Sequence, residues 1–461
     1  MAGASHDPRG EVPGPGSDSS VARAEWFRAA LRGTLQRLPL AGSGGGLDWN
    51  SAPALNMAAV AVRSLSRGVW ATFVPVLLPV AGYGAYSLVQ TTAAITSQVG
   101  ILGTPQTLLR QPGRKLPIAG LFLHSLLIAC IVFPLLGLRG GVEDRWYAIL
   151  VAAMAVTFIA YGILVARAKA ANGFAGVFHA ESIGALTLAL ALAGVLVFRV
   201  GSGNHEMSYV TVASLEIGAT LVVVVSLMAG RTTRVTRKEL TLVGTGAVLP
   251  SVYSVGLLVL LDLLIFRRIE MYFLRASPDG LQGVAVFGLG VQLANLLLLF
   301  PTAMVEAWMP GLAAEFAGAW QDFEARLRTN RRTYLRAFFL VVAASILAPP
   351  LLVRLVFRHY APWTLYVTAF AATRVVCSYA GFYSSALYVT RGERWLYLPG
   401  VLGALASIGF NALLTIRWGV RGAVIAFALT QIGVAIATMI AFRAAGPSMR
   451  DDAGQTASSR G

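Results

Sequence analysis

Residues 174–198 read FAGVFHAESIGALTLALALAGVLVF, an apolar run that contains one carboxylate, Glu181. A helix needs about 20 such residues to cross the hydrocarbon core of a bilayer, and this run is long enough. About twelve segments of this kind follow one another between Leu55 and Phe442, each of spanning length. They predict an all-α, multi-pass membrane protein with about 12 transmembrane helices.

The composition of the whole chain agrees with a membrane protein. Apolar residues make up 56% of the chain and charged residues 13%, and the mean hydropathy is +0.68. Soluble proteins carry about 25% charged residues. The two cysteines, Cys130 and Cys377, lie inside apolar segments and have no metal-ligand spacing, so we expect neither a disulfide framework, a metal site nor a cofactor.

The apolar pattern places the helices at 57–81, 84–109, 117–138, 146–166, 174–198, 208–229, 243–274, 281–307, 335–357, 362–389, 395–416 and 419–442. An even number of helices puts both termini on one side of the membrane. Most Lys and Arg residues fall in the tails and in the loops of that side, such as 110–115, 231–238 and 326–336. Cytoplasmic loops are enriched in these residues, so both termini are predicted to be cytoplasmic. The net charge of +16 then suits an anionic inner leaflet and does not require nucleic acid.

The sequence divides into four parts. Residues 1–54, rich in Gly, Pro and Ser, are predicted to be a disordered cytoplasmic tail, and residues 444–461 a second one. Residues 55–230 and 240–443 would each form a six-helix bundle, separated by a basic loop. Short similarities, such as 84–88 and 285–289 near the start of the second and eighth helices, favour a parallel repeat. Two such bundles around a central cavity suit alternating access.

Three arginines lie inside apolar segments, where a charge costs several kcal/mol. Arg63 and Arg67 are four residues apart and share one face of the first helix, and Arg374 lies mid-way along the tenth. If they face one cavity, they form an anion site that fits a pyrophosphate, because guanidinium binds phosphate bidentately. Alternatively, Arg63 and Arg67 snorkel to the membrane interface.

Acidic residues are candidates for ion coupling or gating. Glu216 and Asp262 are suited to bind a proton or Na⁺, or to pair with an arginine as the bundles move. Glu270 follows Arg267 and Arg268, so a local ion pair is the simpler account of it, with gating as the alternative.

Tyr379 and Tyr383 put two aromatic hydroxyls on one helical face, where they can stack sugars or serve as packing. Asn411 can line a hydrophilic cavity and contact a sugar, or join helices by hydrogen bonds.

Several stretches resemble a known family. They are GYGAYSL at 82–88, RIEMYFL at 268–274, and NALL at 411–414 followed by GVRGAVIA at 419–426. Together they resemble signatures of bacterial polysaccharide and O-antigen (Wzx-like) flippases of the MATE-like multidrug/oligosaccharidyl-lipid/polysaccharide exporter superfamily. Members of the family more often carry Asp where Glu270 stands.

The resemblance implies a transporter for polysaccharide or lipopolysaccharide biosynthesis in the bacterial inner membrane. Its cargo would be an undecaprenyl-diphosphate-linked oligosaccharide, moved from the cytoplasmic to the outer leaflet through a cationic cavity, with coupling to Na⁺ or H⁺. Arg63 and Arg67 would line that cavity. A polysaccharide polymerase or glycosyltransferases would be partners, alongside the lipid-linked substrate and membrane lipids.

Two other functions remain open. A MATE-like multidrug or metabolite antiporter would favour acidic residues in its cleft, and a non-transporting scaffold for polysaccharide assembly would keep its arginines paired and buried. An enzyme is not expected, because the sequence shows no nucleophile–base pair, no paired carboxylates and no metal spacing.

Overall fold

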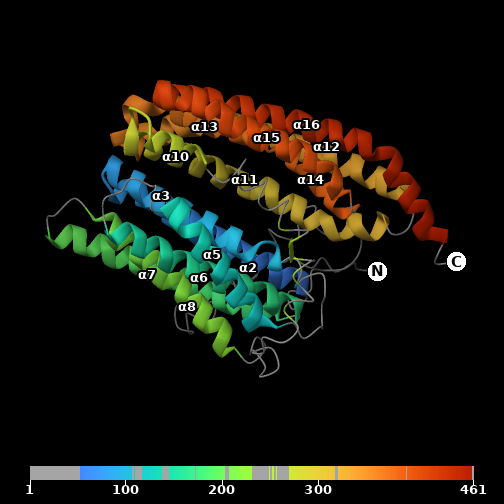
Figure 1. Cartoon of the computed structure of the whole chain (residues 1–461), viewed down its shortest axis with the longest axis horizontal. Helices are drawn as coiled ribbons and strands as arrows, with labels where there is room; N and C mark the ends of the chain where they lie inside the picture. Colours follow the sequence, from blue (N-terminus) through green and yellow to red (C-terminus); the bar gives the residue numbers. More distant parts are fainter. Residues whose placement is uncertain are drawn as a thin grey trace, which may run out of the picture. The chain divides into compact units, whose positions relative to one another are not determined.

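A computed structural model of the chain describes residues 52–105, 108, 117–137, 145–171, 173–202, 207–230, 245, 249, 252–253, 256, 269–316, 320–390 and 392–458. Within these residues the regular structure is helical (Figure 1). Seven helical stretches in them are long and apolar enough to cross a membrane: Trp146–Ala170, Phe174–Val197, Tyr209–Ala229, Gly280–Thr302, Trp320–Leu355, Arg358–Val389 and Arg394–Met449. The predicted class, an all-α multi-pass membrane protein, is confirmed.

The N-terminal half consists of α2 (Ala52–Leu77), α3 (Val80–Ile101), α5 (Ile118–Gly137), α6 (Arg145–Ala170), α7 (Phe174–Ser202) and α8 (Tyr209–Ala229). Helix α3 packs against α5, α6 and α8, and α8 packs against α6 and α7. Tyr147, Met154 and Val212 are buried where these helices meet.

The C-terminal half consists of α10 (Glu270–Arg275), α11 (Gly280–Phe316), α12 (Trp320–Leu355), η2 (Arg358–Trp363), α13 (Thr364–Cys377), α14 (Ala380–Val389), η3 (Glu393–Leu396), α15 (Tyr397–Phe410), η4 (Asn411–Thr415) and α16 (Ile416–Ser458). Helix α11 packs against α12 and α13, and α13 packs against α16. Three buried rings from α11, α13 and α16 hold this half together. The ring of Phe287 lies 4.8 Å from that of Phe370 and 5.5 Å from that of Phe427, both edge-on.

The two halves meet where α3 lies against α11. A Cβ on Gly84 would lie under 3.0 Å from the backbone oxygen of Leu281, so the helices approach more closely there than any side chain allows. Further along, a Cβ on Gly288 would lie 3.0 Å from the Oγ of Ser87. The glycine of the GYGAYSL stretch is therefore a packing requirement of the contact between the halves.

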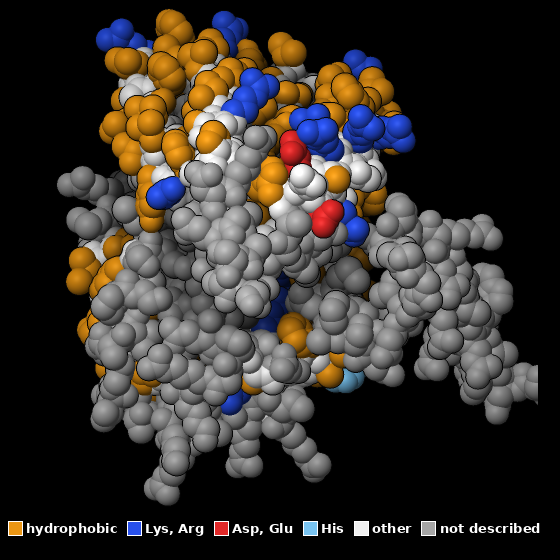
Figure 2. Space-filling model, turned by 90° about the vertical axis from the view of Figure 1, so that its right-hand side faces the viewer, with side chains coloured by type: hydrophobic (Ala, Val, Ile, Leu, Met, Phe, Trp, Pro, Cys, Tyr) orange, Lys and Arg blue, Asp and Glu red, His pale blue; other side chains and the backbone are white. Residues whose placement is uncertain are grey.

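Large apolar side chains cover much of the described surface. Val197, Leu340 and Leu365 are each more than 70% exposed. Figure 2 shows apolar side chains over much of the described part of one end of the molecule, with Lys and Arg among them. Such a surface is unfavourable in water and suits lipid contact.

The predicted helix positions are largely confirmed. The predictions 117–138, 146–166, 174–198 and 208–229 correspond to α5, α6, α7 and α8. The first turn differs, since α2 ends at Leu77 and α3 begins at Val80, earlier than predicted. Pro79 has extended backbone angles and is the N-cap residue of α3. Because its ring and missing N–H disfavour continuation of the preceding helix, α2 ends before it.

Two predicted single helices are interrupted. The segment 362–389 is divided into α13 and α14 by a turn at Ser378 and Tyr379, and the segment 395–416 contains the π-helical η4. Within the predicted helix 243–274, the described positions 245, 249, 252–253 and 256 are helical, and α10 begins at Glu270. The predicted tail 1–54 lies outside the described residues up to position 51.

The predicted disorder of 444–461 is wrong as far as Ser458, because α16 remains helical to that residue. The cause is packing beyond the membrane segment. Ala445 and Met449 are buried against Leu387 and Leu396.

Candidate functional site

In the described residues, three groups of polar and charged side chains each contain a buried carboxylate, two in the N-terminal half and one in the C-terminal half. The first is the arginine cluster, formed by Arg63, Arg67, Phe158, Tyr161 and Glu181. Nη1 of Arg63 donates a hydrogen bond to the hydroxyl of Tyr161 at 3.0 Å, and that hydroxyl donates to Oε1 of Glu181. Glu181 is 6% exposed. The cluster thus joins α2, α6 and α7 through one tyrosine.

Arg67 lies one turn after Arg63 on the same face of α2. Its guanidinium carbon is 5.9 Å from the ring centre of Phe158 and 5.7 Å from that of Tyr161, both within cation–π range. Two positive charges therefore lie together within the N-terminal half beside aromatic rings, and the tyrosine that contacts both is hydrogen-bonded to one buried carboxylate.

The second group, the Glu216 cluster, joins α2, α3 and α8. Oε2 of Glu216 accepts a hydrogen bond from the hydroxyl of Tyr86 at 2.5 Å, and Oε1 accepts one from Nε2 of Gln90 at 3.2 Å. Nε1 of Trp70 donates to the same tyrosine hydroxyl at 3.3 Å. Glu216 is 5% exposed, so these bonds replace the water that the carboxylate loses.

The third group, the Glu270 cluster, lies in the C-terminal half. Glu270, the first residue of α10, is fully buried, and neither of its carboxylate oxygens has a hydrogen-bond partner among the described residues. The guanidinium of Arg374 interacts with it electrostatically. Nη1 of Arg374 also donates to Oε1 of Gln431 at 3.4 Å. Burying a carboxylate whose oxygens accept no hydrogen bond is costly, so the Glu270 carboxylate is a candidate for binding a cation or a proton.

The Glu270 cluster adjoins the contact between the halves. The residue after Glu270, Met271, accepts a hydrogen bond at its sulfur from Oγ1 of Thr91 on α3 at 3.1 Å. Next to it, Oγ1 of Thr92 lies 2.8 Å from the hydroxyl of Tyr272. Glu270 thus directly precedes two residues that contact α3 in the other half.

The three predicted arginines lie in different halves of the chain. Arg63 and Arg67 belong to the arginine cluster of the N-terminal half, whereas Arg374 belongs to the C-terminal half. Their convergence on one cavity stays a prediction. Asp262 lies outside the described residues, as do Arg267 and Arg268, the predicted partners of Glu270.

Tyr379 and Tyr383, the predicted sugar contacts, lie against each other and against neighbouring aromatic rings. The hydroxyls of Tyr379 and Tyr383 lie 3.1 Å apart, and the Tyr379 ring packs near those of Tyr334 and Phe338.

Asn411 is fully buried within its own helical segment. Its Nδ2 donates to the Ser407 carbonyl at 2.8 Å, and its Oδ1 accepts from Thr415 at 2.7 Å. Both bonds lie within one helical segment, and the predicted sugar contact of Asn411 stays a prediction.

Sequence reasoning missed the partners of the charged groups. Tyr161 and Trp70 carry no local signal, because their roles arise only when helices pack together. Tyr86 lies inside GYGAYSL, four residues before Gln90, and this spacing places both side chains on one face of α3. In the described residues, no group of three or more His, Cys, Asp or Glu is arranged to hold a metal ion.

These helices and buried charges define a polytopic α-helical membrane protein with two packed halves. Its fold is that of the MATE transporters and of the lipid II flippase MurJ. The chain is similar to MurJ in an inward closed conformation, with a TM-score of 0.63 at 10% identity, covering 86% of this chain and 89% of that one. It is similar to an inward-facing multidrug resistance MATE family transporter of the MOP superfamily, with a TM-score of 0.60 at 16% identity, covering 85% and 95%.

A MATE protein in a bent conformation gives a TM-score of 0.53 at 17% identity, covering 87% of this chain and 95% of that one. No protein-family model matches the sequence. No curated protein matches it either. The fold is thus established by structure, and the function must be argued from the residues.

Proposed function

We propose that the chain is a flippase for a lipid-linked oligosaccharide. The cargo would be an oligosaccharide on undecaprenyl diphosphate, moved from the cytoplasmic to the outer leaflet of a bacterial inner membrane. The observation that carries the proposal is the pair Arg63 and Arg67, side by side within the N-terminal half of a fold shared with a lipid II flippase. Guanidinium groups stay charged at working pH and bind diphosphate bidentately.

The arginine cluster suits this role for a second reason. A guanidinium has five N–H donors, so the hydrogen bond from Arg63 to Tyr161 is compatible with binding an anion as well. Tyr161 and Glu181 would hold the arginine in position between cargoes. The glycan would pass through the aqueous cavity while the polyprenyl chain stays in the lipid.

We assign the coupling of transport to a proton or Na⁺ gradient to Glu270. Its buried carboxylate interacts electrostatically with Arg374 and lies next to the contact between the halves, so binding a proton or Na⁺ there would change the charge near that contact. A ligand shifts a conformational equilibrium only through its different affinity for the two states. Glu216, whose oxygens accept hydrogen bonds from Tyr86 and Gln90, is the second candidate, and Asp262 stays a prediction.

A MATE-like multidrug or metabolite antiporter is the second candidate function. The observation that favours it is the presence of three buried carboxylates, Glu181, Glu216 and Glu270, together with the MATE fold. Acidic residues would bind cationic drugs, whereas arginines would repel them.

Transport in proteoliposomes separates the two functions. We would follow a fluorescent polyprenyl-diphosphate oligosaccharide and, in parallel, a cationic dye, each with and without Na⁺ and proton gradients. If the chain is a flippase, the lipid-linked sugar should move and the dye should not. Movement of the dye alone would identify an antiporter, and movement of neither under any gradient would favour a scaffold.

A gradient-dependent signal would then be tested in Glu270→Gln. This variant keeps the size of the side chain and removes its charge, so it should abolish the effect of the gradient while cargo binding remains. An unchanged gradient effect in Glu270→Gln would remove Glu270 from the coupling role.

A further inference from the structure

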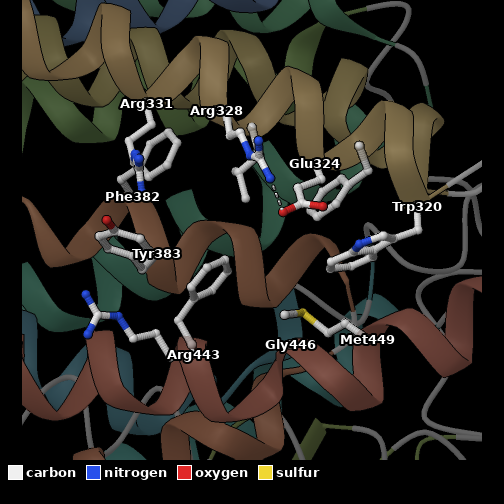
Figure 3. A pocket seen from close by; sticks show the side chains of 12 residues that line it. Trp320, Glu324, Arg328, Arg331, Phe382, Tyr383, Arg443, Gly446 and Met449 are labelled. Atoms are coloured by element: carbon white, nitrogen blue, oxygen red, sulfur yellow. Dashed lines mark hydrogen bonds and ion pairs between the residues drawn. The ribbon is translucent and has the colours of Figure 1, made fainter.

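A pocket lies between α12, α14 and the far part of α16 (Figure 3), and none of its lining residues belongs to the three charge clusters. Its volume is about 250 Å³. Its apolar lining includes Phe323, Phe382 and Met449, which are at most 3% exposed, together with the half-buried Trp320. The pocket therefore has a buried and largely aromatic lining.

The charges around the pocket are mainly positive. Arg331 of α12 and Arg443 of α16 both line it and are exposed, and neither has an ion-pair or hydrogen-bond partner among the described residues. By contrast, the third arginine, Arg328, is paired with Glu324 at 2.8 Å. Figure 3 shows Arg331 and Arg443 on either side of Tyr383, at the end of the pocket away from Trp320. Two guanidiniums from different helices thus flank one opening.

These arginines lie close to the boundary of the apolar segments. On α16 the apolar run ends at Phe442, immediately before Arg443. On α12 the run begins at Ala337, six residues after Arg331, a rise of about 9 Å along a helix. The headgroup layer on each side of a bilayer is about 5–8 Å thick. Both guanidiniums can therefore reach the level of lipid phosphates.

The neighbouring surface on the membrane side is apolar. Phe339 and Leu340 on α12 are 70% and 74% exposed, and Ile440 on α16 is 60% exposed. A molecule whose phosphate lies at the arginines can therefore place acyl chains along these side chains. Its polar headgroup would extend in the other direction, towards Glu324 and Trp320.

We propose that this pocket binds an anionic phospholipid of the adjacent leaflet, with its phosphate held between Arg331 and Arg443. None of the residues lining the pocket belongs to the arginine cluster, so the proposal does not depend on the identity of the transported substrate. Lipid bound there would connect α12 to the extension of α16, and so stabilise the helical end of the chain.

Native mass spectrometry of the delipidated full-length protein in detergent tests the proposal. Phosphatidylglycerol would be titrated against phosphatidylcholine with the same acyl chains. Each arginine near a membrane surface contributes about fivefold in affinity for anionic lipid, so Arg331→Gln/Arg443→Gln should weaken phosphatidylglycerol binding about 30-fold. The matched control is Arg332→Gln/Arg336→Gln, which removes two exposed charges of α12 that do not line the pocket.

A second variant tests the cavity without altering charge. Gly446 lines the pocket, and a Cβ there would have no atom within 4 Å, so Gly446→Leu should fill the space and block binding. Gly433→Leu is its control, since Gly433 lies on the same helix, also with open space around a Cβ, and does not line the pocket.

Three results would overturn the proposal. One is equal weakening by the control pair, which would indicate general electrostatic attraction. Another is equal affinity for phosphatidylcholine. The third is full competition by glycerol 3-phosphate or inorganic phosphate, which would show that the pocket recognises a soluble phosphate and not a lipid.

Discussion

The contact between the halves can be locked by a designed disulfide between positions 87 and 288. A Cβ built on Gly288 lies 3.4 Å from the Cβ of Ser87, and disulfides span Cβ separations of about 3.5–4.5 Å. A shift of a few tenths of an ångström is therefore sufficient for Ser87→Cys/Gly288→Cys to bond. The other close atom, the methyl carbon of Met271, is also 3.4 Å away, an ordinary contact that leaves room for the new side chain.

The expected result follows from alternating access, in which the two halves must separate at this contact during each cycle. Transport should fall in proportion to the cross-linked fraction, and reduction should restore it. The variant would be made with Cys130→Ala and Cys377→Ala, because both native cysteines are free. Cross-linking would be measured by the altered mobility of the chain after cleavage at a protease site introduced between the halves.

Each single cysteine variant, treated with the same oxidant, is the control and should keep its transport activity. Failure to form the disulfide would mean that α3 and α11 do not meet as described. Normal transport by fully cross-linked protein would refute the requirement for movement at this contact.

Three further substitutions test the packing. Gly84→Ala would force a methyl group under 3.0 Å from a backbone oxygen of α11, so it should destabilise the contact by about 1–3 kcal/mol and lower the melting temperature in detergent, and an unchanged melting temperature would contradict the close approach. Tyr86→Phe removes a hydrogen bond to the buried carboxylate of Glu216 and should lower the free energy of unfolding by about 1.5–3 kcal/mol. Adding Glu216→Gln should recover part of this loss, and strict additivity of the two effects would disprove their coupling. Asp279→Ala removes the acceptor for the backbone N–H of Val420 at 2.7 Å and should cost about 1–3 kcal/mol, whereas Asp279→Asn should lose less, so equal losses would argue against this bond.

Much of the fold was accessible from the sequence because lipid imposes a simple rule. A membrane-spanning segment must satisfy its backbone internally, so apolar length alone predicts helices such as Phe174–Ser202. The turn between α13 and α14 was missed, because no proline stands at Ser378 and Tyr379, and the nearby Gly381 lies inside α14.

The helical extension of α16 had a signal that was overlooked. Ala441, Ala445 and Met449 recur every four residues, and all three are buried. The pattern of one buried face continues beyond the apolar run, and it should have favoured a helix over a disordered tail.

Only part of the candidate site could be predicted from the sequence. The spacing of Arg63 and Arg67 predicts that they share a face, and the structure places both against the Tyr161 ring system. Their partners come from α6 and α7, more than 90 positions away along the chain, and no local pattern encodes such a contact. Asn411 differs, because this polar residue forms its hydrogen bonds within its own helical segment, and its predicted sugar contact stays a prediction.

The central claim is that Arg63 and Arg67 bind the diphosphate of a lipid-linked cargo. The most direct test is translocation of a labelled polyprenyl-diphosphate oligosaccharide in proteoliposomes by Arg63→Gln/Arg67→Gln. The control is Arg354→Gln/Arg358→Gln, which removes two exposed arginines with the same spacing. Our account predicts at least about a tenfold loss with the first pair, the effect of one charge-assisted contact of 1.5–3 kcal/mol, and little change with the second. Equal translocation by both pairs, at equal amounts of folded protein, would contradict it.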